Sequence, residues 1–158
     1  MKKKKAKKDG LTLVELMAAV ATGSFVILAS GIILSFGQES WNEECKRAGL
    51  QREAAYAMLG MTQQFKAATN AMIDDANFSA ILVYNSDGDS IRFGKVAGQT
   101  ILRKNINGGN NIDITDKLQN LQFYITPSGK LITTKLTLQV DNVQASSVSS
   151  VMLRNFGG

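Results

Sequence analysis

Glu15 is an acidic residue at the start of a long apolar run, and this position has the clearest chemical consequence in the sequence. Residues 16–36 are 21 consecutive positions without a formal charge, and a block of lysines occupies residues 2–8. About 20 apolar residues in a helix match the thickness of a bilayer core. A carboxylate at the mouth of such a helix is costly, and residues that carry such a cost usually have a partner. What Glu15 pairs with is the question that decides function.

A short basic leader ends in Gly10, and Leu-Thr-Leu-Val-Glu-Leu-Met follows over residues 11–17. This arrangement resembles the class III signal of type IV prepilins and pseudopilins. In that family a membrane peptidase cuts after the glycine, the new N-terminus is N-methylated, and the acid five residues into the mature chain acts in assembly. The resemblance implies cleavage between Gly10 and Leu11, methylation of Leu11, and an assembly role for Glu15.

Thr12, Leu13 and Leu16 complete the recognition motif that the resemblance implies. The close match covers residues 7–36. The family most often has phenylalanine directly after the cut, whereas this chain has Leu11, which is also bulky and apolar. The alternative interpretation is an ordinary signal anchor with an incidental glutamate. A secretory signal fits less well, because its apolar core has about 7–15 residues and precedes its cleavage site.

The net charge of +5 belongs entirely to the leader. Residues 1–10 hold six lysines and one aspartate, and the remaining residues hold twelve basic and twelve acidic side chains. The processed chain is therefore neutral, which gives no reason to expect nucleic-acid binding. Positive flanks stay on the cytoplasmic side of a membrane. We therefore expect the N-terminus inside and the residues after Gly37 outside.

Residue types exclude most catalytic sites. The chain has no histidine, which removes histidine-based metal sites, Ser-His triads and Cys-His dyads. Its single cysteine, Cys45, cannot form an intrachain disulfide, and we expect it to pack on a helix face, with an intermolecular bridge as the alternative. The adjacent carboxylate pairs at residues 43–44 and 74–75 point in different directions on a helix. We expect no enzyme activity and no cofactor.

Two acidic loops are weak candidates for calcium, because hard cations take oxygen ligands from alternating Asp and Asn side chains. Plain turns are the favoured interpretation of both loops. The candidate ligands are Asp87, Asp89, Asp113 and Asp116.

A long helix is expected to run from Leu11 to about Ala71. Apolar residues recur at spacings of three or four in its second half, which indicates one buried face. This face holds Leu50, Ala54, Met58, Met61, Phe65, Ala68 and Met72. Arg52, Glu53, Gln63, Gln64 and Lys66 are expected on the opposite, solvated face.

Strand patterns begin near Ser79. Candidate strands lie at residues 80–84, 91–93, 100–106, 121–125, 131–140 and 148–153, with an Asp87-Gly88 turn of type I′ and a second turn at residues 107–110. Antiparallel strands against one helix predict an α+β fold, in which a long N-terminal helix packs on a β head. The ending Arg154-Asn155 weakly resembles that of minor pilins. The predicted parts are a cleaved leader (1–10), a transmembrane and assembly helix (11–37), its amphipathic continuation (38–72) and an antiparallel β head (73–158).

The sequence thus predicts a structural subunit, a minor pilin or pseudopilin, of a type IV pilus or a type II secretion-like filament; a DNA-uptake filament also fits. The expected location is the inner membrane, as a single-pass protein, and then a periplasmic or cell-surface filament. Expected partners are other pilin or pseudopilin subunits, the prepilin peptidase and methyltransferase, the inner-membrane assembly platform and membrane lipid. The alternative function is a membrane-anchored extracytoplasmic binding module, which needs no processing at Gly10.

Overall fold

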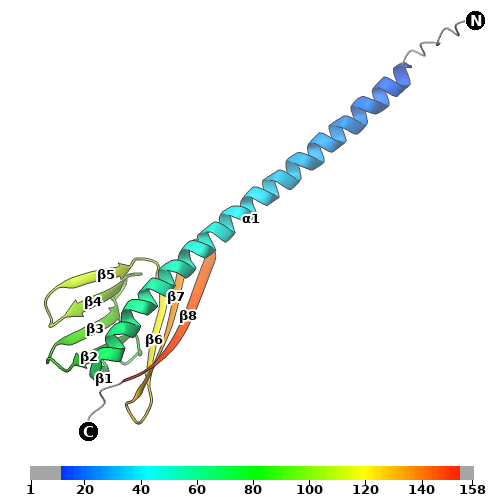
Figure 1. Cartoon of the computed structure of the whole chain (residues 1–158). Helices are drawn as coiled ribbons and strands as arrows, with labels where there is room; N and C mark the ends of the chain where they lie inside the picture. Colours follow the sequence, from blue (N-terminus) through cyan, green and yellow to red (C-terminus); the bar gives the residue numbers. More distant parts are fainter. Residues whose placement is uncertain (1–11, 154–158) are drawn as a thin grey trace, which may run out of the picture. The chain divides into compact units, whose positions relative to one another are not determined.

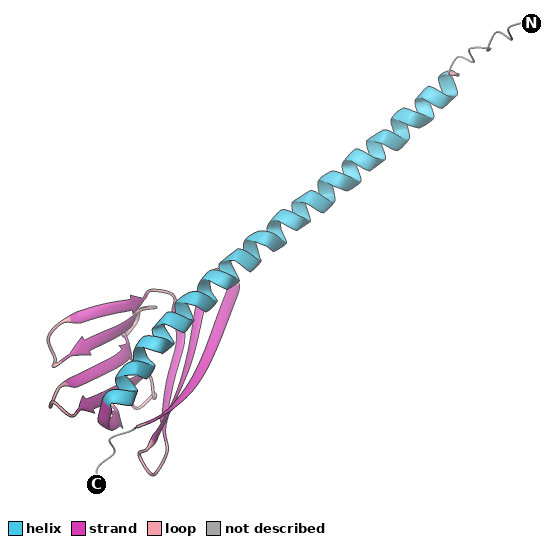
Figure 2. Cartoon of the chain, viewed as in Figure 1, coloured by secondary structure: helices cyan, strands magenta, loops and turns pink. Residues whose placement is uncertain are grey.

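A computed structural model describes residues 12–153, and over them helix α1 (Leu13–Ala67) is followed by eight antiparallel strands (Figures 1 and 2). Strands β1 to β5 form one sheet in chain order, and β6 to β8 form a second sheet. The predicted α+β fold is confirmed. The strands are β1 (Ala68–Ile73), β2 (Ala80–Asn85), β3 (Ser90–Lys95), β4 (Leu102–Ile106), β5 (Asn111–Thr115), β6 (Leu118–Ile125), β7 (Leu131–Val140) and β8 (Val143–Met152).

Residue contacts divide the chain into two units, and each is described by itself. The first unit ends at Asn42, and we call its helical part, residues 13–42, the stem. The second unit begins at Glu43, and we call it the head; it contains the rest of α1 and both sheets.

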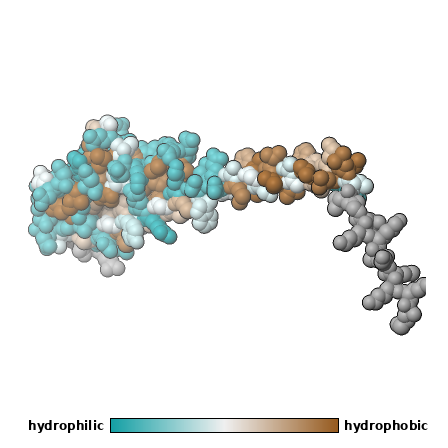
Figure 3. Space-filling view, turned by 90° about the horizontal axis from the view of Figure 1, so that it is seen from above, coloured by the Kyte–Doolittle hydropathy of each residue, from teal (hydrophilic) through white to brown (hydrophobic). Residues whose placement is uncertain are grey.

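The stem is exposed along its whole length and is apolar over residues 16–36 apart from a few hydroxyl side chains. Helix α1 contains an 18-residue window with a mean hydropathy of 2.1 and none of it buried, so it is long and apolar enough to cross a membrane. Figure 3 shows apolar side chains gathered on the stem, whereas the visible surface of the head is mostly hydrophilic. The exposed large apolar side chains of the stem are Leu13, Val14, Leu16, Met17, Val20, Phe25, Val26, Ile27, Leu28, Ile32, Ile33, Leu34, Phe36 and Trp41.

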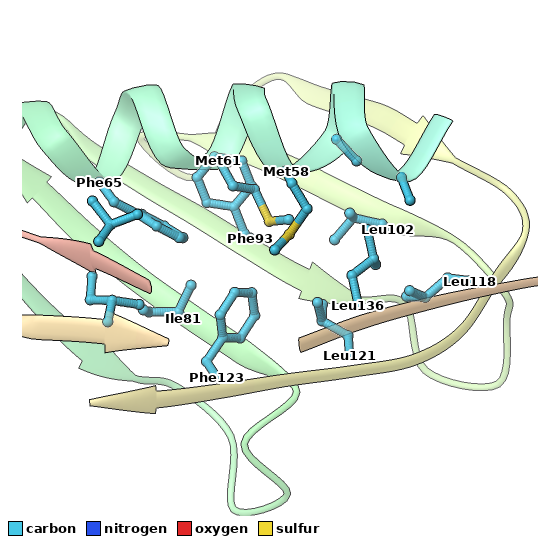
Figure 4. Close-up of a cluster of buried hydrophobic side chains, with 14 of the residues drawn as sticks. Met58, Met61, Phe65, Ile81, Phe93, Leu102, Leu118, Leu121, Phe123 and Leu136 are labelled. Carbon is cyan, nitrogen blue, oxygen red and sulfur yellow. The ribbon is translucent and has the colours of Figure 1, made fainter. Parts of the chain in front are cut away.

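One face of the helix in the head packs on both sheets. Its buried residues recur at helical spacing, which confirms the predicted stripe from Leu50 to Phe65. Phe65 is the centre of this core: its ring meets Phe93 of β3 edge-on at 5.6 Å and Phe123 of β6 edge-on at 6.3 Å (Figure 4). Edge-to-face aromatic pairs are favourable beyond their buried area. The buried helical residues are Leu50, Ala54, Ala57, Met58, Met61 and Phe65.

The prediction that the helix continues to residue 72 was wrong. It ends at Ala67, and residues 68–73 form β1, which pairs antiparallel with β2 through Ala71↔Val83 and Ile73↔Ile81. Met72, expected on the buried helix face, is 45% exposed on this strand. Alanine and methionine favour a helix, but pairing with a partner strand outweighs that weak local preference.

Three smaller expectations also need correction. Strand β5 was not predicted, and β8 begins at Val143 rather than at residue 148. Cys45, expected to pack as a small apolar residue, is exposed. The other predicted strands are present.

The type I′ turn lies in a different hairpin from the one predicted. Such a turn needs positive φ at both central residues. At Asp87-Gly88 only the glycine has positive φ, whereas Asn107 and Gly108 have φ of 52° and 69°. Asn107-Gly108 therefore forms the I′ type, and the bond from the Gly109 amide to the Ile106 carbonyl (2.9 Å) closes it.

Candidate functional site

The start of the stem is closed by a reciprocal set of hydrogen bonds between Thr12 and Glu15. The Thr12 amide and Thr12 Oγ1 each donate to Glu15 Oε2 at 2.9 Å, and the Glu15 amide donates to Thr12 Oγ1 at 3.3 Å. This pattern is a capping box, which satisfies amide groups that the first turn of a helix leaves without partners. It gives a local reason for α1 to begin at Leu13.

The partners of Glu15 in the capping box are uncharged, and its charge has no cationic partner among the described residues. Within residues 12–153, Glu15 forms no ion pair with a lysine or arginine. The hydrogen bonds that these residues make to the carboxylate all end on Oε2. Glu15 is exposed in this single chain, with the exposed Leu16 and Met17 following it.

The capping function of Glu15 was not predicted. Threonine followed three residues later by glutamate, before an apolar run, is the recognised sequence pattern for it. Thr12 therefore contacts Glu15 directly, while Leu13 and Leu16 are exposed apolar residues on the first turns of the stem. Gly10 and Leu11, the residues of the predicted cleavage, lie outside the described residues, as do the leader and Arg154-Asn155.

Four hydroxyl side chains within the stem bond to the helix itself. Thr22, Ser24, Ser30 and Ser35 each donate their hydroxyl hydrogen to the carbonyl four residues earlier, at 2.7–3.0 Å. A hydroxyl bonded in this way needs no water, so it can lie in an apolar environment at little cost.

The stem glycines have no packing partner among residues 12–153. A Cβ built at Gly23, Gly31 or Gly37 meets nothing within 4 Å. Gly31 also lies in a shallow groove on the surface of the helix, lined by the side chains of Ile27, Ile32 and Phe36 among others. Grooves between side chains on one helix are filled by the ridges of a second helix when two helices pack.

Two ion pairs in the head join α1 to connections between strands. Lys117 Nζ lies 2.7 Å from Glu53 Oε2, Thr115 donates its hydroxyl to Glu53 Oε1, and Lys46 Nζ lies 2.7 Å from Asp141. Partial burial acts to raise the pKa of Glu53, but the hydrogen bonds from Lys117 and Thr115 outweigh it and hold the pKa below its usual value. Glu53 was predicted on the solvated face, and that prediction was wrong.

The four calcium candidates do not come together. Asp113 pairs with Arg103 at 2.6 Å, a hydrogen bond that lowers the pKa of Asp113. Asp89 accepts a hydrogen bond from Asn107 at 2.8 Å, and Asp87 accepts one from Ser86 at 3.3 Å. Over residues 12–153 there is no group of three or more metal-ligating His, Cys, Asp or Glu side chains. Asp116 contributes its backbone carbonyl to Thr100.

The head also carries an exposed aromatic pair that the sequence did not indicate. Phe78 and Tyr124 are stacked with ring centroids 6.2 Å apart, and each is about half exposed. Phe78 has a φ of 58°, which is an uncommon backbone conformation for a bulky residue. It is held there because the Phe78 amide donates to Asp75 and the Phe123 amide donates to the Phe78 carbonyl at 2.8 Å.

The described residues therefore combine a long apolar N-terminal helix with an antiparallel β head, which is a pilin-like architecture. Comparison of the chain with protein-family models, with curated proteins and with solved structures finds no match.

Proposed function

We propose that this chain is a structural subunit, a minor pilin or pseudopilin, of a type IV pilus or a type II secretion-like filament. The observation that carries the proposal is Glu15, an acid without a cationic partner among the described residues, held in the first turn of an exposed apolar stem. The lysines of the leader keep the N-terminus inside and the head outside. The chain acts by assembly and not as an enzyme.

The proposed assembly step pairs two charges of neighbouring subunits. Cleavage between Gly10 and Leu11 removes the leader and leaves a free amine at Leu11, which the methyltransferase then methylates without loss of its positive charge. An incoming subunit brings this amine beside Glu15 of a docked subunit. The capping bonds direct Oε2 toward Thr12, so Oε1 is available to the amine. In a medium of low dielectric constant, leaving either charge unpaired costs most, so pairing sets the axial register of the subunits.

The rest of the stem supports close packing with other stems. The hydroxyls of Thr22, Ser24, Ser30 and Ser35 are bonded to carbonyls of the same helix, and the stem glycines have open space around them. Small residues let helices approach closely in a membrane. The partners in this proposal are other pilin or pseudopilin subunits, the prepilin peptidase and methyltransferase, and the inner-membrane assembly platform.

The test is the N-terminal mass of the mature protein, measured in cells with and without the prepilin peptidase. A mature chain that begins with methylated Leu11 only when the peptidase is present supports the proposal. A chain that keeps its lysine leader where it functions contradicts it. The assignment as a minor subunit rests on the single Cys45, on the absence of proline from residues 11–37 and on the C-terminal resemblance, and the abundance in sheared filaments tests it.

A second candidate function is a membrane-anchored binding module, and the Phe78–Tyr124 pair favours it. Exposed, stacked aromatic rings on a strained turn offer a contact surface for a partner. In this alternative the stem only tethers the head. An unprocessed N-terminus together with loss of ligand capture on Tyr124→Ser would support it over the filament subunit.

A further inference from the structure

Strand β8 forms a long free edge of the second sheet. Within residues 12–153 it pairs only with β7, and it is the outermost strand of that sheet in Figure 1. The pairing runs without a register shift from Leu131↔Met152 to Val140↔Val143. The edge is therefore ten residues long, regular and without a bulge.

Alternate residues of β8 present their backbone groups to this free edge. The Leu153 amide donates to the Lys130 carbonyl at 2.8 Å, so Leu153 faces β7. Hydrogen-bonded and non-bonded pairs alternate along an antiparallel ladder. The odd-numbered residues from Val143 to Val151 therefore bond to β7, and the even-numbered residues present their N–H and C=O groups outward. The outward residues are Gln144, Ser146, Val148, Ser150 and Met152, and all five side chains are exposed.

This edge lacks the features that normally prevent strand pairing. Exposed edges usually carry lysine, proline, a bulge or a short strand. Residues 143–152 contain no charged residue, no proline and no glycine. One outer strand of the other sheet is different: β5 has five residues, contains the charged Asp113 and pairs with β4 through a register shift. The open edge of β8 is thus better suited to adding a strand than that of β5.

The sequence of β8 is self-complementary about Val148. Reading outward from this residue, the serines face serines and the buried apolar positions face each other, whereas the outermost exposed pair sets Gln144 opposite Met152. The matched positions are Ser147 with Ser149, Ser146 with Ser150, Ala145 with Val151, Gln144 with Met152 and Val143 with Leu153. An antiparallel pair of two such strands keeps every inner-face residue beside an inner-face residue, and it brings no like charges together.

We propose that β8 pairs with β8 of a second copy of this chain, antiparallel and about a two-fold axis at Val148. The pairing joins two three-stranded sheets into one of six strands, and the outward N–H and C=O groups of each edge bond to the other. A two-fold contact uses the same surface on both copies, as this strand can. The axis reverses the direction of the second head. The contact therefore joins oppositely directed subunits, such as those of two filaments, and it does not depend on the function proposed above.

Cysteine cross-linking of the full chain in detergent tests the register. In a Cys45→Ser background, Val148→Cys places the two thiols directly opposite each other, so mild oxidation gives a covalent dimer. Ser146→Cys alone gives none, because its two copies lie four residues apart, roughly 13 Å at about 3.3 Å per residue. Mixing Ser146→Cys chains with Ser150→Cys chains restores the cross-link. Failure of Val148→Cys to cross-link, or equal cross-linking of Ser146→Cys with itself, overturns the proposal.

A charge at the two-fold axis gives an independent test. Val148 is 63% exposed, so Val148→Lys leaves the head folded, as its thermal unfolding checks. Like charges directly opposite each other destabilise a strand pair. We expect Val148→Lys to shift the full chain from dimer to monomer in sedimentation, while the uncharged, β-branched Val148→Thr keeps the dimer. A parent chain that stays monomeric at all concentrations overturns the proposal. So does protection of the β8 backbone amides from hydrogen exchange that arises only when a different protein is added.

Discussion

Two groups of Thr12 bond to the same carboxylate oxygen of Glu15: the amide and the hydroxyl of Thr12 both donate to Glu15 Oε2 at 2.9 Å. Glu15 thus caps its own helix and also carries the charge that the proposed assembly needs. These two roles can be separated, because glutamine also serves at this position of a capping box.

Glu15→Gln is expected to keep the cap and the membrane insertion but to reduce incorporation into filaments. The loss is about a hundredfold or more, since an unpaired charge left by removing one partner of a buried pair costs about 3–5 kcal/mol. Quantitative mass spectrometry of sheared filaments measures it. Thr12→Ala is the matched control: it keeps the charge and loses only about 1 kcal/mol of capping. Normal incorporation of Glu15→Gln would reject the role of the charge.

Phe65→Ala is expected to destabilise the head by about 3–5 kcal/mol, because it removes a fully buried ring that packs between the two sheets. Denaturant unfolding of the full chain in detergent, followed by a spectroscopic signal of the head, measures the change. Tyr56→Ala, on the same helix but 75% exposed, is the control and should change the free energy of unfolding by less than about 0.5 kcal/mol. Equal effects of both variants would contradict the described core.

The Glu53–Lys117 pair is expected to make head stability depend on pH at the acidic end. The folded-state pKa of Glu53 lies below its ordinary value of 4.5. Its stabilisation is therefore fully present above pH 4.5 and is lost as the pH falls through the lower folded-state pKa. Glu53→Gln should cost about 1 kcal/mol at neutral pH and flatten the acid limb of the stability curve. Thermal unfolding of parent and variant between pH 7 and pH 3 measures this, and parallel curves would exclude the pair.

Gly94→Ala is expected to destabilise the head by about 1–3 kcal/mol through overpacking. A Cβ at Gly94 would lie 3.0 Å from the Cβ of Ala80 and 3.1 Å from Arg92 Nη1. Gly60→Ala should instead stabilise α1 by about 1 kcal/mol, since a Cβ there meets nothing within 4 Å and alanine favours a helix interior. Opposite shifts in the melting temperature are the expected result, and a stabilised Gly94→Ala would contradict the packing over β3.

The elements that could be predicted from the sequence are those whose signal is local and long. Strand β7 shows alternation over its whole length, and its bounds, Leu131–Val140, agree with the prediction. The helical stripe from Leu50 to Phe65 was found because four turns repeat the same spacing. The capping function of Glu15 could have been found from the Thr-x-x-Glu pattern, and the aromatic pair could not, because Phe78 and Tyr124 are far apart in sequence.

The apolar stem and the single acid at its start were determined by the sequence alone, because length, apolarity and a capping box are local properties that need no distant partner. The end of α1, strand β1 and the half-buried position of Glu53 were decided by tertiary structure. Residues 68–73 are a strand because β2 lies beside them, and Glu53 is partly buried where Thr115 and Lys117 supply its hydrogen bonds. Contacts from residues distant along the chain outweighed preferences worth less than about 1 kcal/mol per residue.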